Sequence, residues 1–409
     1  MKWTRSQKNV VVAAYLGWAL DAFDFFLMVF MFSDIANTFH VERKEVVFAV
    51  TLTLAARPIG AFIFGRLADH FGRKPTLMWN ILAFSVLEVA SGFAPTLTTF
   101  LMLRFLFGIA MGGEWGIGSA LTFESIPASA RGQVSGLLQA GYPSGYFIAA
   151  IAMFFFYDQF GWRNMFILGA APAILVFFIR LGVDESPAYI EQKLVKERPN
   201  LIEVLGRNWK LALYAICLMT AFNFFSHGSQ DAYPNLFLKV QHHFDTKTLS
   251  LMTAIANIGA IFGGIGFGWL SGRIGRRRAI MIAALFALPV IPFWAFASTP
   301  LILGVGAFLI QVSVQGAWGI VPVHLNELSP PEIRATFPGV VYQLGNLIAS
   351  VNLPIQESIA AAHGENYGLA MAIVVGTVAV VISLLVAFGP EKRGIAMSEE
   401  HRKAAAVVT

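Results

Sequence analysis

Apolar runs close to a membrane-spanning length recur along the whole chain, separated by short polar stretches. A helix needs about 20 apolar residues to cross the hydrocarbon core of a bilayer. This pattern predicts twelve transmembrane helices, at 10–32, 46–67, 75–94, 99–121, 134–156, 163–182, 209–238, 249–270, 279–297, 301–323, 337–359 and 367–388. The first run is too long for a signal peptide and lacks a small-residue cleavage pattern. The longest polar stretch, roughly 184–210, predicts a cytoplasmic linker.

The seventh run breaks the apolar pattern with a stripe of polar residues. Asn223, Ser226, His227, Gln230 and Asp231 are spaced i, i+3, i+4, i+7 and i+8. On a helix these positions share one face. Ionisable groups at membrane depth are costly and normally face a bundle interior or a wet cavity. The stripe therefore indicates a pathway for a polar solute.

The composition supports a membrane protein over a soluble one. Hydrophobic residues make up 56% of the 409 residues and charged residues 13%, whereas soluble domains carry about 25% charged residues. The single cysteine, Cys217, excludes an intrachain disulfide.

The distribution of the basic residues indicates the membrane topology of the chain and not a nucleic-acid partner. If both termini are cytoplasmic, 22 of the 29 Lys and Arg residues lie on the cytoplasmic side, as the positive-inside rule requires. These are Lys2, Arg5, Lys8, Arg66, Arg73, Lys74, Arg131, Arg180, Lys193, Lys196, Arg198, Arg207, Lys210, Arg273, Arg276, Arg277, Arg278, Arg334, Lys392, Arg393, Arg402 and Lys403. We therefore expect a multi-pass protein of the plasma or inner membrane with both termini inside.

Two motifs occur twice at one separation. The stretch Gly65–Lys74 is echoed by Gly268–Arg277, and Glu124–Gly136 by Glu327–Gly339, both shifted by 203 residues. Six spans plus six in the same orientation is the parallel-repeat plan of a transporter, with its substrate site between the halves. We expect a first bundle at 1–185, a linker at 186–208 and a second bundle at 209–409.

These motifs resemble those of the major facilitator superfamily. Gly65–Lys74 is similar to the loop signature between its second and third helices, and Arg104-x-x-x-Gly108-x-x-x-Gly112-Gly113 to its fourth-helix motif. Asp21-Ala-Phe-Asp24 resembles the sialate:proton symporter family. The stripe Asn223 to Asp231 resembles the helix-7 signature of its lactate/pyruvate permease branch, except that Asn235 stands where that signature has Thr. The resemblance implies an all-α fold of twelve transmembrane helices in two six-helix bundles.

The candidate substrate residues are hydrogen-bonding or cationic groups inside the predicted spans. Arg57 either binds a substrate carboxylate bidentately or forms a structural salt bridge with Asp21, Asp24 or Glu114. Residues similar to Gln343 and Asn346 lie on the substrate path of the lactate permeases, and polar contact between helices is the alternative. Together the predicted binding residues are Arg57, Asn223, His227, Gln230, Tyr342, Gln343 and Asn346.

The candidate proton-coupling residues are Asp21, Asp24, Arg104, Glu114, His227 and Asp231. Either aspartate of the first helix carries a proton or serves in helix packing. His227 and Asp231, four residues apart, are expected to pair, either to exchange a proton or as a static contact. The resemblance implies that Arg104 assists proton transfer, with a structural role as the alternative, and Glu88 is a further proton candidate.

The loop residues Asp69, Arg73 and Lys74 are expected to act as a gate. The resemblance implies that Asp69 pairs with basic groups or a helix N-terminus and holds the halves together. An exposed pair contributes under about 1 kcal/mol, so such a latch needs a partly buried geometry. Gly272 replaces Asp69 in the second copy, so that copy should latch less well.

The sequence as a whole predicts a proton-coupled symporter that imports small monocarboxylates such as lactate and pyruvate. No enzyme signature occurs, and no metal or cofactor is expected. The partners expected are the carboxylate, protons and the bilayer, with the protein as a monomer. The alternatives are transport of a larger acid, such as sialate or an aromatic carboxylate, and a non-transporting membrane sensor.

Overall fold

The computed structural model describes residues 3–194 and 200–398. Within these residues the chain is helical and contains no strands. Five members of the predicted cytoplasmic set lie outside the described residues: Lys2, Lys196, Arg198, Arg402 and Lys403.

The first half contains the elements up to residue 181. They are α1 (Arg5–Phe30), α2 (Phe32–Phe39), α3 (Arg43–Phe71), α4 (Arg73–Gly92), α5 (Leu97–Gly112), α6 (Glu114–Ser125), η1 (Ala128–Ala130), α7 (Arg131–Gln139) and α8 (Gly141–Leu181). Two short helices follow in the linker, α9 (Pro187–Lys193) and α10 (Leu201–Arg207).

The second half repeats this plan. Its elements are α11 (Trp209–Gln230), η2 (Tyr233–Gln241), α12 (Thr246–Ile274), α13 (Arg276–Ala295), α14 (Pro300–Trp318), α15 (Val321–Leu328), η3 (Pro331–Ile333), α16 (Phe337–Ala349), α17 (Asn352–Ala362) and α18 (Tyr367–Phe388).

The helices break at residues with special backbone chemistry, once between two predicted spans and once inside one. Gly161 has a φ of 63° and divides α8 into two helices, which correspond to the predicted spans 134–156 and 163–182. Pro234 lacks the N–H that would bond to the carbonyl of Gln230, and here α11 gives way to the π-helical segment η2. Nine helices in the described part of the chain are long and apolar enough to cross a membrane.

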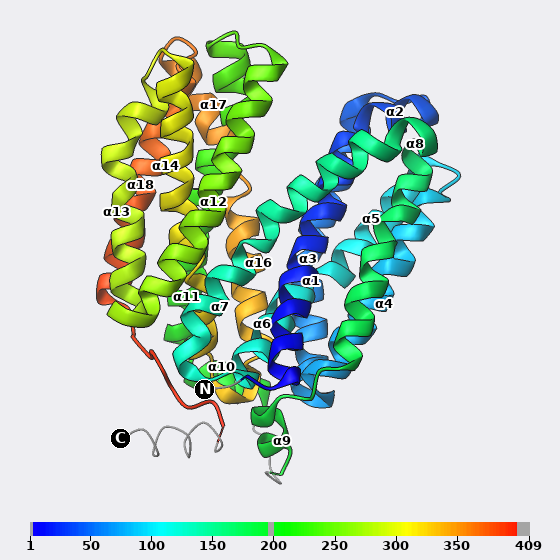
Figure 1. Cartoon of the computed structure of the whole chain (residues 1–409), viewed down its shortest axis with the longest axis vertical. Helices are drawn as coiled ribbons and strands as arrows, with labels where there is room; N and C mark the ends of the chain where they lie inside the picture. The colour runs from blue at the N-terminus through cyan, green and yellow to red at the C-terminus, as the bar shows by residue number, and fades with distance from the viewer. Residues whose placement is uncertain (1–2, 195–199, 399–409) are drawn as a thin grey trace.

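The helices of each half gather into one bundle, with α11–α14 and α18 on one side of Figure 1 and α1–α5 on the other. The bundles approach each other near α9 and α10, at the end where the first and last described residues lie, which we call the terminal end. Glycines permit this approach. A Cβ on Gly136 would lie 2.2 Å from the carbonyl oxygen of Gly264, and one on Gly65 would lie 2.6 Å from the Cα of Thr336. The all-α, two-bundle fold class is confirmed, whereas the predicted boundaries at 185 and 208 stay a prediction.

Candidate functional site

Arg57 is a buried cation without a carboxylate partner. Seven arginines are buried within the described residues, and six of them lie within 4.0 Å of a carboxylate oxygen: Arg73, Arg104, Arg131, Arg180, Arg276 and Arg334. The side chain of Arg57 is instead 2.9 Å from the sulfur of Met111, and its Nε–H has no acceptor. The structural salt bridge considered as the alternative for Arg57 is therefore not formed in this conformation.

Close packing of α3 on α5 fixes the backbone at Arg57. A Cβ on Gly112 would lie 2.1 Å from the carbonyl oxygen of Arg57, and one on Gly108 would lie 2.3 Å from that of Thr53. Only residues without a side chain allow two helices to approach this closely. The glycines of the fourth-helix motif thus position the backbone of Arg57 against α5.

The first half buries four carboxyl groups, of which Asp21 interacts electrostatically with Arg57. Glu114 accepts a 2.6 Å bond from Arg180, and Glu88 accepts one of the same length from Arg104. Asp21 and Asp24 are 2% and 1% exposed, and one oxygen of each has no hydrogen-bond partner. Asp21 interacts electrostatically with Arg57, Glu114 and Arg180, whereas Asp24 interacts with Glu88 and Arg104. Each aspartate therefore lies beside one acid–arginine pair.

His227 connects α11 with α16. Its Nδ1 lies 3.1 Å from Asp231 Oδ2, and its Nε2 lies 2.9 Å from Asn346 Oδ1. Both ring nitrogens thus face oxygen atoms, which suits the doubly protonated imidazolium. A neutral ring fits the same place only after the Asn346 amide turns over. The side chains of His227 and Asp231 are 34% and 35% exposed, so this pair is reachable from solvent.

The other polar residues of the predicted stripe form their hydrogen bonds within the second half. Asn223 is buried and donates to the carbonyl oxygen of Met219, one turn earlier in α11. Gln230 donates to Ser226 and to Gln311 of α14. Gln343 is 3% exposed, and its Oε1 has no donor. Gln343 thus keeps an unused acceptor, whereas the amide N–H groups of Asn223 and Gln230 donate inside the second bundle.

Tyr342 stands in an aromatic cluster between the halves. Its ring centroid is 4.8 Å from that of Trp115, 5.6 Å from that of Trp318 and 6.5 Å from that of Trp18. Its hydroxyl interacts electrostatically with Arg57 and Asp21. The cluster therefore brings aromatic surface from both halves to the unpaired guanidinium.

Asp69 bonds to the second half at the terminal end. It accepts hydrogen bonds from the backbone N–H groups of Ala335 and Thr336, at 3.0 and 3.2 Å, and from the Thr336 hydroxyl at 2.5 Å. These N–H groups immediately precede α16, where a helix attracts negative charge. Asp69 is 4% exposed, so the partly buried geometry that a latch needs is present.

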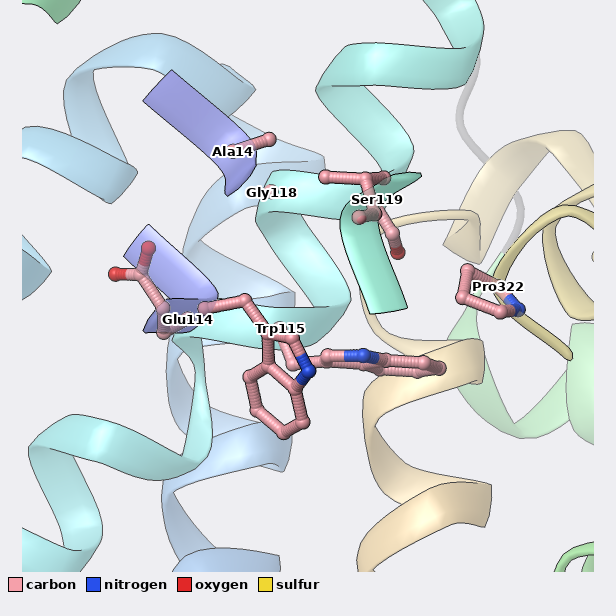
Figure 2. Close-up of a pocket in the computed structure, with 8 residues that line it drawn as sticks. Ala14, Glu114, Trp115, Gly118, Ser119 and Pro322 are labelled. Atoms are coloured by element: carbon pink, nitrogen blue, oxygen red, sulfur yellow. The ribbon is translucent and has the colours of Figure 1, made fainter. Parts of the chain in front are cut away.

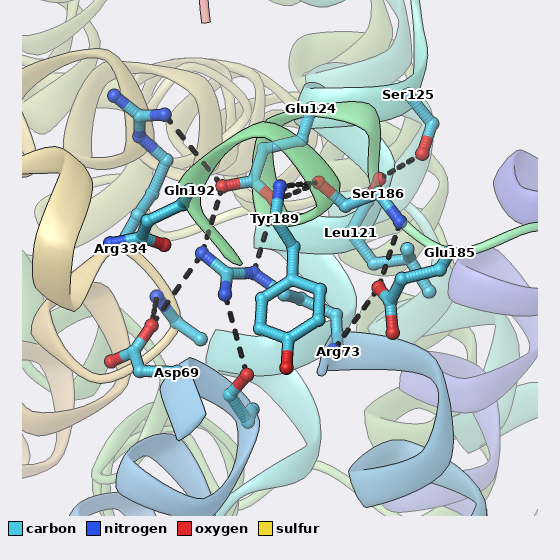
Figure 3. A network of polar contacts seen from close by, with 12 residues as sticks. Asp69, Arg73, Leu121, Glu124, Ser125, Glu185, Ser186, Tyr189, Gln192 and Arg334 are labelled. Carbon is cyan, nitrogen blue, oxygen red and sulfur yellow. Dashed lines mark hydrogen bonds and ion pairs between the residues drawn. The ribbon is translucent and has the colours of Figure 1, made fainter. Parts of the chain in front are cut away.

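Arg73 holds a second contact between the halves through Glu124. The two side chains form a bidentate pair at 3.1 and 3.2 Å, and Arg334 of the second half lies 3.7 Å from the same carboxylate (Figure 3). Burial lowers the pKa of Arg334, and the Glu124 carboxylate acts against that shift. Lys74, by contrast, donates to the carbonyl oxygen of Leu181 in its own half.

The 203-residue repeat reproduces this arrangement. Arg276 pairs with Glu327 at 2.9 and 3.0 Å, and Arg131 of the first half lies 4.0 Å from Glu327. Each half thus contributes one arginine to the acid–arginine pair of the other. The copy lacks the latch carboxylate because Gly272 stands at that position.

Sequence reasoning missed several residues of this site. Arg180 was expected at the cytoplasmic surface, yet it is 2% exposed and bonded to Glu114. Arg180 lies near the end of an apolar run. The positive-inside rule counts charges outside the spans, so it does not reveal that this arginine is buried. Trp18 and Trp318 were missed as well, since aromatic residues are frequent throughout this chain.

Comparison with known proteins identifies relatives over almost the whole chain. The profile of the family described as Major Facilitator Superfamily matches residues 14–354. The chain is 30% identical to a carboxylic acid transporter protein homolog of Saccharomyces cerevisiae, over 96% of this chain and 69% of that protein. It is 29% identical to the sialic acid transporter NanX of Escherichia coli, over 93% and 94%. The solved structure of the proton:xylose symporter XylE has a TM-score of 0.80 at 18% identity and covers 98% of this chain and 99% of its own.

Proposed function

Because the chain belongs to the Major Facilitator Superfamily, a family of transporters and not of enzymes, we propose that it imports small monocarboxylates such as lactate and pyruvate together with protons. The observation that carries the proposal is Arg57, a buried guanidinium without an ion pair among the described residues. An unpaired charge at membrane depth is costly, so its retention calls for an anionic ligand. A carboxylate matches the planar fork of donors on arginine.

The second half supplies the groups that orient this carboxylate and bind the rest of the molecule. Gln343 offers an unused acceptor, and His227 with Asn346 forms a half-exposed hydrogen-bonding pair. A hydroxyl next to the carboxylate can donate to the Gln343 oxygen, whereas a keto oxygen there accepts from an amide or imidazole N–H. The aromatic rings around Tyr342 leave limited room, which favours a small acid over a bulky one.

The closed end of the molecule indicates from which side the site is open in this conformation, and the proton gradient sets the direction of net transport. We place the terminal end in the cytoplasm, as the positive-inside rule requires. Asp69, Arg73 and Arg334 then hold the cytoplasmic side shut while the site is reachable from outside. Binding of one proton and one monoanion leaves the net charge unchanged, so the loaded halves rock without a charge penalty.

A larger organic acid is the second candidate substrate. The sialic acid transporter of Escherichia coli is nearly as similar to this chain as the yeast carboxylic acid transporter homolog. Sialate also carries a carboxylate that Arg57 would bind, so size and not charge separates the two candidates.

The deciding experiment measures uptake into proteoliposomes under an inward proton gradient. Lactate, pyruvate, acetate and sialate are tested with the wild-type protein and with Arg57→Ala. We expect the wild type to accumulate lactate or pyruvate and Arg57→Ala to lose about 2–5 kcal/mol of binding, or roughly 30-fold or more in kcat/KM.

Two controls make this experiment specific. Arg57→Lys keeps the charge but loses the fork, so we expect it to recover part of the uptake. If lactate accumulation does not depend on the imposed proton gradient, transport is not coupled to protons. Full activity of Arg57→Ala would remove the carboxylate anchor.

A further inference from the structure

Two cavities of this molecule differ in their surroundings. The smaller one measures about 20 Å³ and lies between the halves, with Glu114 on one side and Pro322 on the other (Figure 2). It adjoins the aromatic cluster and belongs to the site described above. The larger one measures about 410 Å³, which is within the range of about 300–1,000 Å³ that is usual for ligand pockets. The larger cavity therefore has room for a ligand and lies outside the candidate site.

The larger cavity is a groove between α12 and α14. The residues that line it belong to the first three turns of each helix, and all of them except Thr248 are apolar. The opposite end of α12 packs on α7 at the terminal end, where a Cβ on Gly136 would lie 2.2 Å from the carbonyl oxygen of Gly264. The groove thus lies at the end of the molecule away from the terminal end.

The groove opens on the face that α12 presents to the bilayer. Its residue Leu251 begins a stripe of apolar residues that follows one side of the helix through Ile255, Ile258, Phe262, Ile265 and Trp269. Leu251 is 61% exposed, and Leu301 on the other side of the groove is 79% exposed. In a chain that spans a membrane, a wholly apolar and exposed stripe of this kind lies against lipid chains.

The groove exists because close packing of α12 on α14 ends at Gly304. Below the groove, a Cβ on Gly259 would lie 2.3 Å from the carbonyl oxygen of Phe308. A Cβ on Gly304 would instead meet only Cδ1 of Ile255, at an ordinary contact distance of 3.8 Å. The two backbones therefore touch below the groove and separate at Gly304, which has no side chain to fill the gap.

The corresponding place in the first half is occupied by a side chain. The equivalent helices α3 and α5 begin at Arg43 and Leu97, each 203 residues before α12 and α14. Leu101 is thus the equivalent of Gly304, and it packs against the hydrophobic core of the first half. The groove of the second half therefore depends on the side chain that is missing at Gly304.

The mouth of the groove favours an anionic group. Thr248 and Pro300 lie in the first turns of α12 and α14, so the positive ends of both helix dipoles meet there. The first N–H groups of α14 have no partner within the helix, and no side chain caps them. Lys247 is exposed and adjoins Thr248. The nearby carboxylate of Asp245 accepts the N–H of Thr248 at 3.4 Å and thereby caps α12.

Lys247 also differs from its equivalent in the first half, which is Lys44. The Nζ of Lys44 lies 2.7 Å from a carboxylate oxygen of Glu42, so its charge is compensated by a neighbour. Lys247 forms no ion pair in the described part of the chain. The positive charge next to the groove is therefore available to a ligand.

We propose that the groove holds an acyl chain of an anionic glycerophospholipid from the bilayer leaflet at this end, with the lipid phosphate at Lys247 and the start of α14. An empty groove would leave its lining atoms without van der Waals partners, and a lipid chain supplies them. Bilayer chains are as apolar as the lining, so shape and headgroup charge and not hydrophobicity select this lipid. The inference goes beyond the proposed function and does not depend on which solute is transported.

Native mass spectrometry of protein released from nanodiscs tests the groove. The nanodiscs contain equal amounts of phosphatidylglycerol and phosphatidylcholine with the same acyl chains. We expect the wild type to retain a phosphatidylglycerol molecule that Gly304→Leu does not retain, because the leucine fills the groove as Leu101 fills the equivalent place. Gly266→Leu is the matched control, at an exposed glycine of α12 where an added Cβ meets no atom within 4 Å, and should retain lipid as the wild type does.

Lys247→Gln tests the headgroup contact in the same nanodiscs. Removal of one lysine near the membrane surface should lower the ratio of retained phosphatidylglycerol to phosphatidylcholine by about fivefold. Lys44→Gln is the control in the first half and should change this ratio less, because Lys44 is already paired with Glu42.

Three results would overturn the inference. The first is equal retention of phosphatidylglycerol by the wild type and by a folded Gly304→Leu protein. The second is a wild type that retains phosphatidylcholine as well as phosphatidylglycerol. The third is a dimer that is present in the wild type and lost in Gly304→Leu, which would assign the groove to a second copy of this chain. If Gly304→Leu does not fold, Val305→Phe fills the groove from its exposed rim and should cause the same loss of lipid.

Discussion

The two halves bury different kinds of polar group at mid-membrane depth. The first half buries charges, including the pairs Glu88–Arg104 and Glu114–Arg180. The second half buries neutral amides at comparable places, among them Asn223, Gln311, Gln343, Asn352 and Gln356. Its buried ion pairs, such as Arg276–Glu327, belong to the network at the terminal end.

This difference indicates that the two copies share the fold and the acid–arginine pairs of the terminal end, but not the latch carboxylate or the site. Charges must be paired when they are buried, whereas amides need only hydrogen bonds. A half that holds charges is suited to bind protons and an anion. A half that holds amides is suited to recognise the uncharged part of the substrate. We therefore expect mutations in the two halves to have different costs.

The largest effect is expected when a buried charge in the first half loses its partner. Arg104→Ala leaves Glu88 unpaired and removes stacking on Phe107, 4.0 Å away. We expect the free energy of unfolding to fall by about 3–5 kcal/mol. In the second half, Gln311→Ala removes hydrogen bonds to Ser229 and Gln230 and should cost about 1 kcal/mol. Denaturant titration in detergent micelles measures both.

A double variant controls for the loss of side-chain volume. Arg104→Gln combined with Glu88→Gln removes both charges and should be more stable than Arg104→Ala alone. Equal destabilisation by Arg104→Ala and Gln311→Ala would contradict the proposed difference between the halves.

An intermediate effect is expected at His227. His227→Ala leaves Asp231 and Asn346 without their shared partner, so transport of lactate should lose about 1–3 kcal/mol of stabilisation, or roughly 5-fold to 150-fold in kcat/KM. The proton-to-lactate ratio should stay unchanged if protons belong to the first half. His363→Ala, in exposed α17, serves as the matched control. A variant that exchanges lactate but moves no protons would assign proton coupling to the second half.

The fold followed from the sequence because membrane burial imposes simple rules. A helix needs about 20 apolar residues to span a bilayer, and each of the twelve predicted spans coincides with a helix or a pair of helices in the described residues. The break at Gly161 falls between the predicted spans 134–156 and 163–182, whereas the interruption at Pro234, inside the predicted span 209–238, was not predicted. That interruption depends on local backbone chemistry, which the average apolarity of a span does not report.

The site followed from the sequence only in part, because its geometry depends on contacts between distant helices. The i, i+4 pair of His227 and Asp231 is local and could be predicted. The bond from Arg180 to Glu114 joins residues 66 positions apart, and no periodicity reveals it. Helical periodicity likewise put Gln230 on the stripe with His227, but it cannot tell that Gln230 bonds to Gln311.

A smaller effect is expected from the latch at Asp69. Asp69→Asn removes the negative charge at the start of α16 and one of its acceptor sites. A charge at a helix N-terminus contributes about 0.3–2 kcal/mol, so the population closed at the terminal end should fall by up to roughly 30-fold relative to the open one. Distances between spin labels placed on the two halves at the terminal end report these populations. An unchanged distance distribution would exclude a latch role for Asp69.

The smallest effect is expected when the second copy is given the same latch. Gly272 is the equivalent of Asp69, and an added Cβ there meets no atom within 4 Å. The groups equivalent to Ala335 and Thr336 are Gly132 and Gln133, in the first turn of α7, whose N–H groups lack partners within that helix. Gly272→Asp should therefore stabilise the closed terminal end by about 0.3–1 kcal/mol. Gly272→Asn has the same shape without the charge. If both variants give the same distance distribution, α7 does not attract the added charge, and the asymmetry between the halves has another cause than the missing carboxylate.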